Sequence, residues 1–350
     1  MNDMTKVITL AQIAELTGGS VVGDPEIQIS SISDPRRPKD GAISPLWEKK
    51  LEKFAAGCPV LFTKKGWVKE GQSGVELDEP RAGLIALLKF FDEAPERERT
   101  VSERALVDKD ATLGENVAVG AGSVIKAGAS VGDDTVIMEN VFIDCGVTIG
   151  KNCVIEPGAV VFHHSVLGDG CVLHANAVVG CDGFGFLPDP KAGMVKIPQI
   201  GIARLDDGVE IGAFSSVDRA TFGETYIGKC TKIDSHVKIG HNCQIGAYTI
   251  IVAQSGIAGS SHIGNRVIMA AQSGTANHAS VGDGCTVGGR GGVTADVPAG
   301  SIVSGFPAQD HRKELRLQAA VRQLPEMASS VKELGKRMAA LEKRLEDENA

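Results

Sequence analysis

The stretch IGKCTKIDSHVKIGHNCQIGAYTIIVAQSGIAGSSHI, residues 227–263, places an isoleucine at every sixth position. The same step of six continues to Val293 with two imperfect members, and an earlier block keeps it from Val107 to Val179. Four residues after each aliphatic position stands a small side chain, such as Thr231. A period of six fits neither the 3.6-residue turn of a helix nor the alternation of an ordinary strand. It is typical of a parallel β-helix built from hexapeptides.

Three hexapeptides make one triangular coil of such a β-helix, and successive coils stack at the spacing of neighbouring strands. We therefore expect the aliphatic residue of each hexapeptide to fill the interior, with the small residue beside it. Aromatic residues make up only 4% of the chain and there are 43 glycines, which a narrow prism with tight corners explains. Four of the eight cysteines take the small position and are expected to be buried fillers: Cys153, Cys171, Cys243, Cys285.

Charge, hydropathy and cysteine spacing exclude several classes of function. A net charge of -8 without a long basic stripe argues against nucleic-acid binding. The sequence contains no run of about 18 apolar residues, so no membrane span is predicted. Residues 1–10 lack the charged and apolar segments of a secretory leader. The cysteines form no CxxC pair, which predicts reduced thiols that bind no metal, in a cytoplasmic protein.

Residues 1–103 lack the period and indicate a small α/β domain with its own core. Thr9 is placed to cap a helix that ends at Gly18. An apolar strand is predicted over residues 58–63 and an apolar helix over 82–94.

The rest of the chain divides into the β-helix, residues 104–309, and a tail, residues 310–350, predicted as two helices separated at Pro325. A solenoid has no helix to meet the apolar seam of the second one, so we expect the tail to join copies of the chain. A trimer is favoured because triangular prisms pack around a threefold axis; packing onto the first tail helix is the alternative. The seam has the 3-4 spacing of a coiled coil: Val331, Leu334, Met338, Leu341, Leu345.

The segment GCDGFGFLPDPKAGMVKIPQIG, residues 180–201, interrupts the period. In a solenoid such a loop protrudes from one face, often the functional one. Farther on, His241 stands two residues past the interior position Ile239, so its side chain is expected to point out of the prism. His278 follows 37 residues later, one more than two complete coils. The two histidines should therefore share a face, about 9.5 Å apart.

Five motifs resemble the UDP-3-O-acylglucosamine N-acyltransferases of lipid A synthesis: VGCDGFGF (179–186), VKIPQIG (195–201), VDRATFGETYIG (217–228), KIGHNCQIG (238–246), SGFPAQ (304–309). The resemblance covers essentially the whole chain, and its most specific element is the DGFGF loop followed by KIPQ. It implies a homotrimer with an N-terminal uridine-binding domain, a left-handed β-helix and C-terminal helices. It also implies a UDP-sugar acceptor and acyl-carrier protein as donor. No separate cofactor is implied, because 4′-phosphopantetheine on the carrier holds the acyl group.

Making an amide from a thioester requires a base for the attacking amine and a donor for the oxyanion, but no covalent nucleophile. By resemblance, His241 is the base, and His278 holds the sugar or the reacting centre. Asp234 is a candidate to orient His241, with solvation at a corner as the alternative. The insertion offers four candidate substrate-binding residues: Phe184, Phe186, Lys196, Gln199.

The segment aligned with the family's uracil site departs from the family pattern. Pro45, Glu48 and Leu51 stand where the resemblance leads us to expect Phe, Asn and Tyr. Either Trp47 stacks on the base instead, or nucleotide binding is weakened.

A second departure lies near the end of the β-helix. Gly292 and Thr294 stand where the family has bulky Met side chains close to the acyl chain. The missing side chains predict a wider channel and a preference for a longer acyl donor. The alternative is that the glycine only serves a tight corner, with other residues closing the channel.

Two other enzyme classes share the predicted fold. Zinc carbonic anhydrases bind their metal through three His at about 2.0–2.1 Å, and His236 and His241 form an H-x4-H pair. Their third ligand would fall at Ile200, inside the insertion. O-acyltransferases that act on UDP-GlcNAc are closer rivals, but they lack the N-terminal domain and the DGFGF loop. A scaffold without activity would leave His241 in its motif unexplained.

Overall fold

The computed structural model describes residues 6–93 and 98–348. The chain forms two compact units, Met1–Glu96 and Arg97–Ala350, each with its own apolar core. Both units are built as the composition and periodicity predict: a small α/β unit is followed by a parallel solenoid.

The solenoid unit begins before residue 104, where the sequence placed the boundary. Val101 forms a parallel bridge with Val119, and the Ser102 amide donates to the Val119 carbonyl at 2.9 Å. The first coil therefore takes in residues that precede the first recognisable hexapeptide.

The N-terminal unit packs two helices against a five-stranded sheet of order β2-β7-β6-β5-β4. Helix α1 (Leu10–Thr17) has a capping box at Thr9 and ends at Gly18 in the left-handed conformation, as predicted. Helix α2 (Pro80–Phe91) lies within three residues of the predicted ends. The remaining elements are β1 (Ile8–Thr9), β2 (Ser20–Val22), β3 (Gln28–Ile29), β4 (Ser31–Ile32), β5 (Ala42–Leu46), η1 (Lys49–Gly57), β6 (Val60–Lys64) and β7 (Ser73–Leu77).

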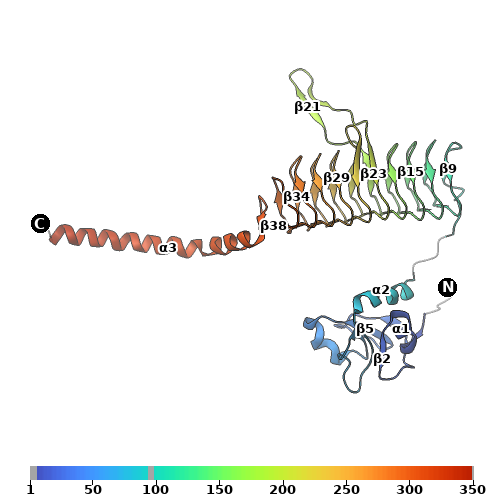
Figure 1. Cartoon of the computed structure of the whole chain (residues 1–350), viewed down its shortest axis with the longest axis horizontal. Helices are drawn as coiled ribbons and strands as arrows, with labels where there is room; N and C mark the ends of the chain where they lie inside the picture. Colours follow the sequence, from blue (N-terminus) through green and yellow to red (C-terminus); the bar gives the residue numbers. More distant parts are fainter. Residues whose placement is uncertain (1–5, 94–97, 349–350) are drawn as a thin grey trace. The chain divides into compact units, whose positions relative to one another are not determined.

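The solenoid has three sheets, parallel except for the last strand β39 and named here by their first strands, and the chain visits them in the order β8, β9, β10. Figure 1 shows the coils stacked along the solenoid. The β8 sheet contains β8 (Leu106–Val107), β11 (Val124–Ile125), β14 (Phe142–Ile143), β17 (Val160–Val161), β20 (Val178–Cys181), β25 (Ser216–Asp218), β28 (Lys238–Ile239), β31 (Gly256–Ile257), β34 (Gly274–Thr275) and β37 (Gly292–Val293).

The β9 sheet contains β9 (Thr112–Leu113), β12 (Ser130–Val131), β15 (Thr148–Ile149), β18 (Val166–Leu167), β23 (Ile202–Leu205), β26 (Glu224–Ile227), β29 (Gln244–Ile245), β32 (His262–Ile263) and β35 (Ser280–Val281). The β10 sheet contains β10 (Ala118–Val119), β13 (Val136–Ile137), β16 (Val154–Ile155), β19 (Val172–Leu173), β24 (Glu210–Ile211), β27 (Lys232–Ile233), β30 (Ile250–Ile251), β33 (Ile268–Met269), β36 (Thr286–Val287), β38 (Ile302–Ser304) and β39 (Gln309–Asp310).

The interior of the prism is the predicted aliphatic ladder. Ile239 is paired with Ile257 and Ile245 with Ile263, so each interior side chain stacks on the same position of the next coil. All four members of this example are almost completely buried. The four cysteines at the small position are 0% exposed, which confirms that they fill the interior.

The insertion leaves the solenoid between β20 and β23 as an antiparallel hairpin, β21 (Phe186–Asp189) and β22 (Gly193–Lys196). Figure 1 shows it standing off from the stacked coils. At the far end of the solenoid, β39 runs antiparallel to β38 and is the last strand of the β10 sheet.

The tail is one helix, α3 (His311–Glu348), and not the two that Pro325 predicted. A proline inside a helix removes one backbone donor, and here the residues on both sides keep the helix going past that loss. A single helix cannot fold back on itself, so the seam does not pack onto an earlier tail helix. Val331, Leu334 and Met338 are 66%, 55% and 60% exposed. The side chain of Leu345, the last member of the seam, lies outside the described residues.

Among residues 6–93 and 98–348, no helix combines the length and the apolar composition that crossing a membrane requires.

The interior ladder yields a matched pair of variants on one strand. Ile251 is 0% exposed and its neighbour Ile250 is 44% exposed. Ile251→Ala leaves a cavity between coils and should lower the free energy of unfolding by about 2–5 kcal/mol. Ile250→Ala should cost much less. Denaturant unfolding of both variants checks this; equal losses would mean that the ladder does not carry the stability of the solenoid.

Candidate active site

Both predicted histidines and the insertion lie at one edge of the prism, the corner between the β8 and β9 sheets. The insertion leaves the chain at this corner, His241 follows β28 there, and His278 follows β34. One coil, containing β31, separates the two histidines, so they lie two strand spacings apart along the corner, about 9.5 Å. They do not occupy the same position in their coils: the Ser260 amide donates to the His241 carbonyl and the His278 amide to the Gly259 carbonyl, so His278 stands in line with Asn242. His278 is exposed, whereas His241 is partly buried.

Two glycines hold the imidazole of His241 between them. A Cβ built on Gly183, in the insertion, would lie 2.6 Å from the Cβ of His241. A Cβ on Gly259, in the next coil, would lie 2.7 Å from its Nε2. Only glycine leaves room for the ring at these two places. Gly259 belongs to the next coil, so the Nε2 edge of the ring lies against that coil.

The side chain of Asn242 fixes the protonation of the His241 ring. Its Nδ2 donates to the Phe222 carbonyl at 2.9 Å, and its Oδ1 accepts the Thr221 amide at 2.9 Å. These two bonds determine which end of the amide is the oxygen. His241 Nδ1 lies 3.0 Å from that oxygen, which can only accept. Nδ1 therefore carries the hydrogen, and in the neutral ring Nε2 keeps a free lone pair.

The insertion is tied to the same network through Gln199. This side chain is 6% exposed; its Oε1 accepts the Thr221 hydroxyl at 3.0 Å and its Nε2 donates to the Ile197 carbonyl at 3.1 Å. Gln199 thus positions the loop and has little capacity left for a ligand. Lys196, in contrast, forms an exposed ion pair with Asp182 at the base of the loop.

The two aromatic residues of the loop are directed to solvent. Phe184 is 82% exposed and Phe186 is 36% exposed. Their rings meet edge to face with centroids 5.1 Å apart. They remain available to a ligand or a partner.

The expected contact between Asp234 and His241 is not present. Asp234 belongs to the preceding corner, between the β10 and β8 sheets. Its Oδ1 accepts the Ser235 amide at 2.7 Å and its Oδ2 accepts the Ala253 amide at 3.1 Å. The carboxylate therefore caps two backbone donors of adjacent coils, because the width of the β8 sheet separates it from the imidazole.

The space expected to be open over Gly292 is occupied. The ring of Phe306 lies against this glycine, so that any Cβ at residue 292 would overlap it. The prediction of an empty volume was wrong, because the loop after β38 returns to the β8 sheet and covers its last strand. Thr294 follows that strand at the same corner as His241.

Trp47 does not present an open ring for stacking. It packs against the core of the N-terminal unit that includes Ile43 and Phe62, and its indole N–H is buried with no hydrogen-bond partner among residues 6–93 and 98–348. The hypothesis that its ring takes over base stacking stays a prediction.

The two members of the H-x4-H pair lie at different corners. His236 stacks on Phe214 with ring centroids 5.4 Å apart, at the corner before that of His241. In the described parts of the chain, no three His, Cys, Asp or Glu side chains are grouped so that they could hold a metal ion.

Sequence reasoning missed two residues of the site. Asn242 directly follows His241, and that adjacency was the available signal. Arg219, in VDRATFG, is 2% exposed and donates to the Gly180 and His163 carbonyls at 2.7 and 2.8 Å. It closes the base of the insertion, which a linear motif does not reveal.

The family description "Bacterial transferase hexapeptide (six repeats)" matches residues 128–163, 146–181 and 224–259. The chain is 47% identical to a UDP-3-O-acylglucosamine N-acyltransferase of Syntrophus aciditrophicus, over 96% of this chain and 93% of that protein. It is also 47% identical to one of Syntrophotalea carbinolica, over 97% and 99%. The crystal structure of Arabidopsis UDP-N-acetylglucosamine acyltransferase has the same fold, with a TM-score of 0.54, 23% identity, and coverage of 63% and 77%.

The role of Asn242 can be tested by its removal. Asn242 has φ 59°, so Asn242→Gly deletes the amide without straining the backbone. In ¹⁵N NMR spectra of histidine-labelled protein at neutral pH, His241 should carry its hydrogen on Nδ1. In the variant it should shift toward the Nε2–H form. Asn176→Gly, also with φ 59° but in a distant coil, is the matched control. An unchanged spectrum for Asn242→Gly would show that this amide does not select the tautomer.

Proposed function

The chain belongs to the family of UDP-3-O-acylglucosamine N-acyltransferases, and we propose that it takes the acyl group from acyl-carrier protein, with His241 as general base. The acceptor is the 2-amino group of a UDP-3-O-acylglucosamine, in a cytoplasmic step of lipid A synthesis. The observation that supports His241 is its geometry: Asn242 holds the hydrogen on Nδ1 and leaves Nε2 as the basic atom. The Arabidopsis UDP-N-acetylglucosamine acyltransferase is similar in fold alone.

The reaction needs one proton transfer in each direction. The amine attacks the thioester carbonyl carbon while Nε2 of His241 takes one of its protons. The tetrahedral intermediate collapses, the C–S bond breaks, and the imidazolium returns the proton to the leaving thiolate. The products are an amide and the free thiol of the carrier. No thiolate nucleophile is required, and burial raises the pKa of Cys181, beside the insertion, to about 12, so that it stays protonated.

The charge that develops on the carbonyl oxygen needs a donor on the Nε2 side of His241. We assign this to the Gly259 backbone amide, which has no hydrogen-bond partner within the described chain and belongs to the glycine that faces Nε2. His278, about 9.5 Å along the corner, is exposed and suited to hold the sugar.

We propose that the N-terminal unit binds the uridine. Trp47 is half-buried against the core of that unit, and stacking on it is not part of the proposal. Glu48 stands where the family has an asparagine. As a carboxylate it can only accept hydrogen bonds, so it is suited to accept one from the N–H of uracil. A hydrogen bond from Lys50 lowers the pKa of Glu48 and keeps it ionised.

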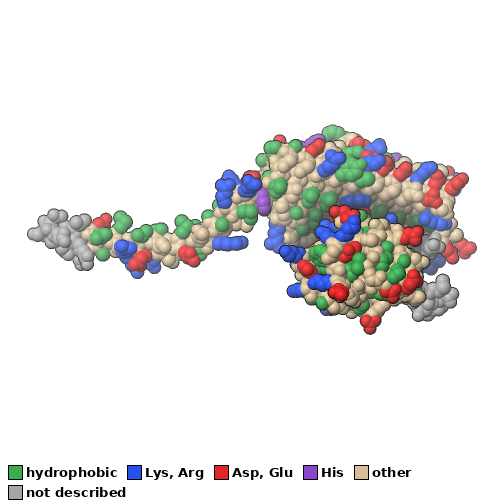
Figure 2. Space-filling model, turned by 60° about the horizontal axis from the view of Figure 1, so that its bottom comes forward, with side chains coloured by type: hydrophobic (Ala, Val, Ile, Leu, Met, Phe, Trp, Pro, Cys, Tyr) green, Lys and Arg blue, Asp and Glu red, His purple; other side chains and the backbone are tan. Residues whose placement is uncertain are grey.

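Helix α3 supports the proposals of a homotrimer and of carrier-protein binding. The exposed seam of α3 is suited to pack against the same helix in other copies of the chain. Figure 2 shows Lys and Arg side chains gathered where α3 leaves the solenoid. The sequence there is HRKELR, residues 311–316. Such a basic segment complements the anionic phosphate of the 4′-phosphopantetheine arm.

The base is tested by His241→Ala. Loss of a general base costs about 10²–10⁴-fold in rate, while the oligomer and its thermal stability should be retained. Mass spectrometry of the product made from UDP-3-O-acylglucosamine and a panel of acyl-carrier proteins measures the transfer. His262→Ala removes an exposed histidine from the β9 sheet and should leave the rate unchanged. Activity of His241→Ala within about threefold of the parent protein contradicts the assignment.

The donor chain is proposed to lie along the β8 sheet, where outward-facing Gly256, Gly274 and Gly292 are paired on successive coils. Phe306 closes this glycine row. Phe306→Ala should extend it, and because each buried CH₂ contributes about 0.8 kcal/mol, donors longer by two carbons should gain about tenfold in relative rate. Gly292→Met must displace the ring and should favour shorter donors. Competition between donors of two lengths measures the ratio of their rates. Identical ratios in the parent protein, Phe306→Ala and Gly292→Met would show that the acyl chain of the donor binds elsewhere.

A further inference from the structure

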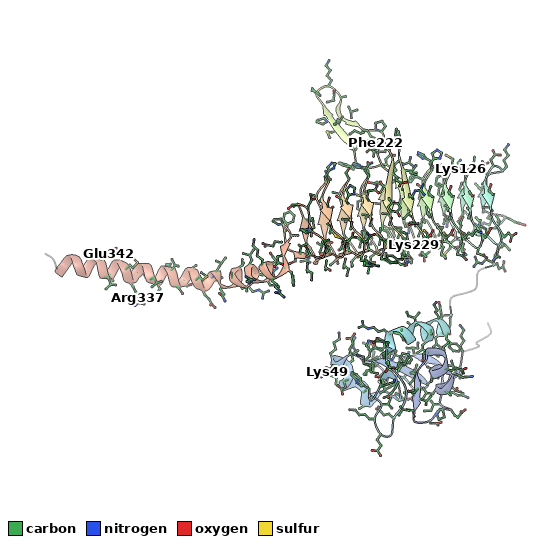
Figure 3. All side chains as sticks on the ribbon, in the orientation of Figure 1. Lys49, Lys126, Phe222, Lys229, Arg337 and Glu342 are labelled. Atoms are coloured by element: carbon green, nitrogen blue, oxygen red, sulfur yellow. The ribbon has the colours of Figure 1, made fainter. Side chains whose placement is uncertain are left out.

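Arg219 is an almost completely buried cation at the corner where the insertion leaves the solenoid. Its side chain is 2% exposed, and burying a charge is costly unless its donors are paired. Its Nε donates to the Gly180 carbonyl at 2.7 Å, and its Nη2 donates to the His163 carbonyl at 2.8 Å. Its Nη1 contacts Nε2 of the His163 ring. Figure 3 labels two residues of this edge of the prism, Lys126 and Phe222, and shows the hairpin rising from it.

The contact with Arg219 determines which nitrogen of the His163 ring is bare. A guanidinium has five N–H donors and no acceptor, so Nε2 of His163 accepts and carries no hydrogen. In the neutral ring the hydrogen is then on Nδ1, which lies 3.4 Å from Oδ2 of Asp144. The same oxygen accepts the His163 backbone amide at 3.2 Å. Asp144 and Arg219 therefore hold the imidazole from two sides.

The side chain of Arg219 joins three consecutive coils. His163 follows β17, Gly180 is part of β20, and Arg219 itself follows β25. The backbone amide of Arg219 also donates to the Cys181 carbonyl at 2.8 Å. A guanidinium can bond both coils at once because its donors form a planar fork, whereas the single ammonium of a lysine cannot reproduce this geometry. The first residues of the insertion are thus attached to the coils before and after them.

The attachment at Gly180 also places Gly183, the glycine beside His241. Gly180 has φ 84°, and a Cβ on it would overlap the hydroxyl of Ser165, so only glycine fits there. Three residues later, Gly183 lies against the Cβ of His241. A shift of this short turn would therefore move one of the two glycines that hold the His241 ring.

We propose that His163 is a positioning residue for the transfer step. Its bare Nε2 holds the Arg219 guanidinium, which holds the start of the insertion at Gly180. Gly183 is thereby kept against the ring of His241. This inference rests on the proposed function, since it takes His241 as the base from it. Misplacing a catalytic group by about 1 Å costs up to about 10²-fold in rate, so His163 acts on the rate from three coils away.

The test compares two substitutions of His163 in the full-length protein. His163→Gln keeps an acceptor at the ε position, whereas His163→Leu has an apolar side chain without one. The His163 side chain is 44% exposed, so both variants should fold. With acyl-carrier protein and UDP-3-O-acylglucosamine as substrates, kcat should fall about 10- to 100-fold in His163→Leu and stay within about threefold of the parent in His163→Gln.

The neighbouring histidine supplies the matched control. His164 is exposed and has φ 59°, and Gln254 holds φ 63° at the equivalent position of another corner. His164→Gln should therefore fold without strain and leave kcat unchanged.

A second measurement does not depend on turnover. In ¹⁵N NMR spectra of histidine-labelled protein at neutral pH, His163 of the parent should carry its hydrogen on Nδ1. The ring signals of His241 should move in His163→Leu and stay in place in His163→Gln and His164→Gln. Thermal unfolding of the same proteins shows whether a change in rate accompanies a change in stability.

Three outcomes overturn the proposal. Equal kcat values for His163→Leu and His163→Gln would mean that the acceptor at the ε position is not needed. A lower thermal stability of His163→Leu with unchanged kcat would make the contact a structural support only. Unmoved His241 signals in His163→Leu would break the link to the base. If the parent protein forms no N-acyl product, the proposed function fails, and the NMR comparison still decides whether His163 positions His241.

Discussion

The stacking of one aliphatic side chain on the next, coil after coil, is the interaction on which the rest of the solenoid depends. Each coil contacts only the coils before and after it, so its interior positions must repeat at a constant spacing. That constraint fixes which residues face outward and which occupy corners. A corner residue therefore recurs at the same edge of the prism in each coil. Polar side chains that are far apart in the sequence therefore line up in one column along an edge of the prism.

The candidate active site follows from placing an irregular loop within that column. The hairpin replaces an ordinary corner between β20 and β23. At the same corner, the next coil has an elongated loop that ends at Gly223, and the coil after that carries His241. Side chains from the loop and from the regular corners meet in one hydrogen-bond network: Gln199, Thr221, Asn242, His241. The imidazole is rigidly held because loop and solenoid each contribute a glycine beside it. The orientation of the His241 ring is thus set by two glycines and the Asn242 amide, and not by Asp234.

The period of six predicted which residues lie inside the prism and which lie at its corners. It predicted little about the contacts that an outward-facing side chain makes. The interior ladder, the buried cysteines and the shared corner of His241 and His278 all follow from counting. The partners of Asp234 and the ring over Gly292 do not, because they are set by turn geometry and by a loop that returns over the end of the sheet. The uninterrupted helix at Pro325 shows that a local preference yields when the flanking residues favour the helix.

The antiparallel strand β39 has a consequence for self-assembly into fibres. A stack of parallel coils ends in unpaired backbone edges, and an identical stack can add to such edges without limit. In the β10 sheet, the terminal edge is instead formed by a strand of reversed direction, whose hydrogen-bonding pattern does not match the first strand of another copy. The chain then turns away as a helix. The loop with Phe306, which covers Gly292 of the β8 sheet, thus belongs to the same segment that ends the parallel stacking of the β10 sheet.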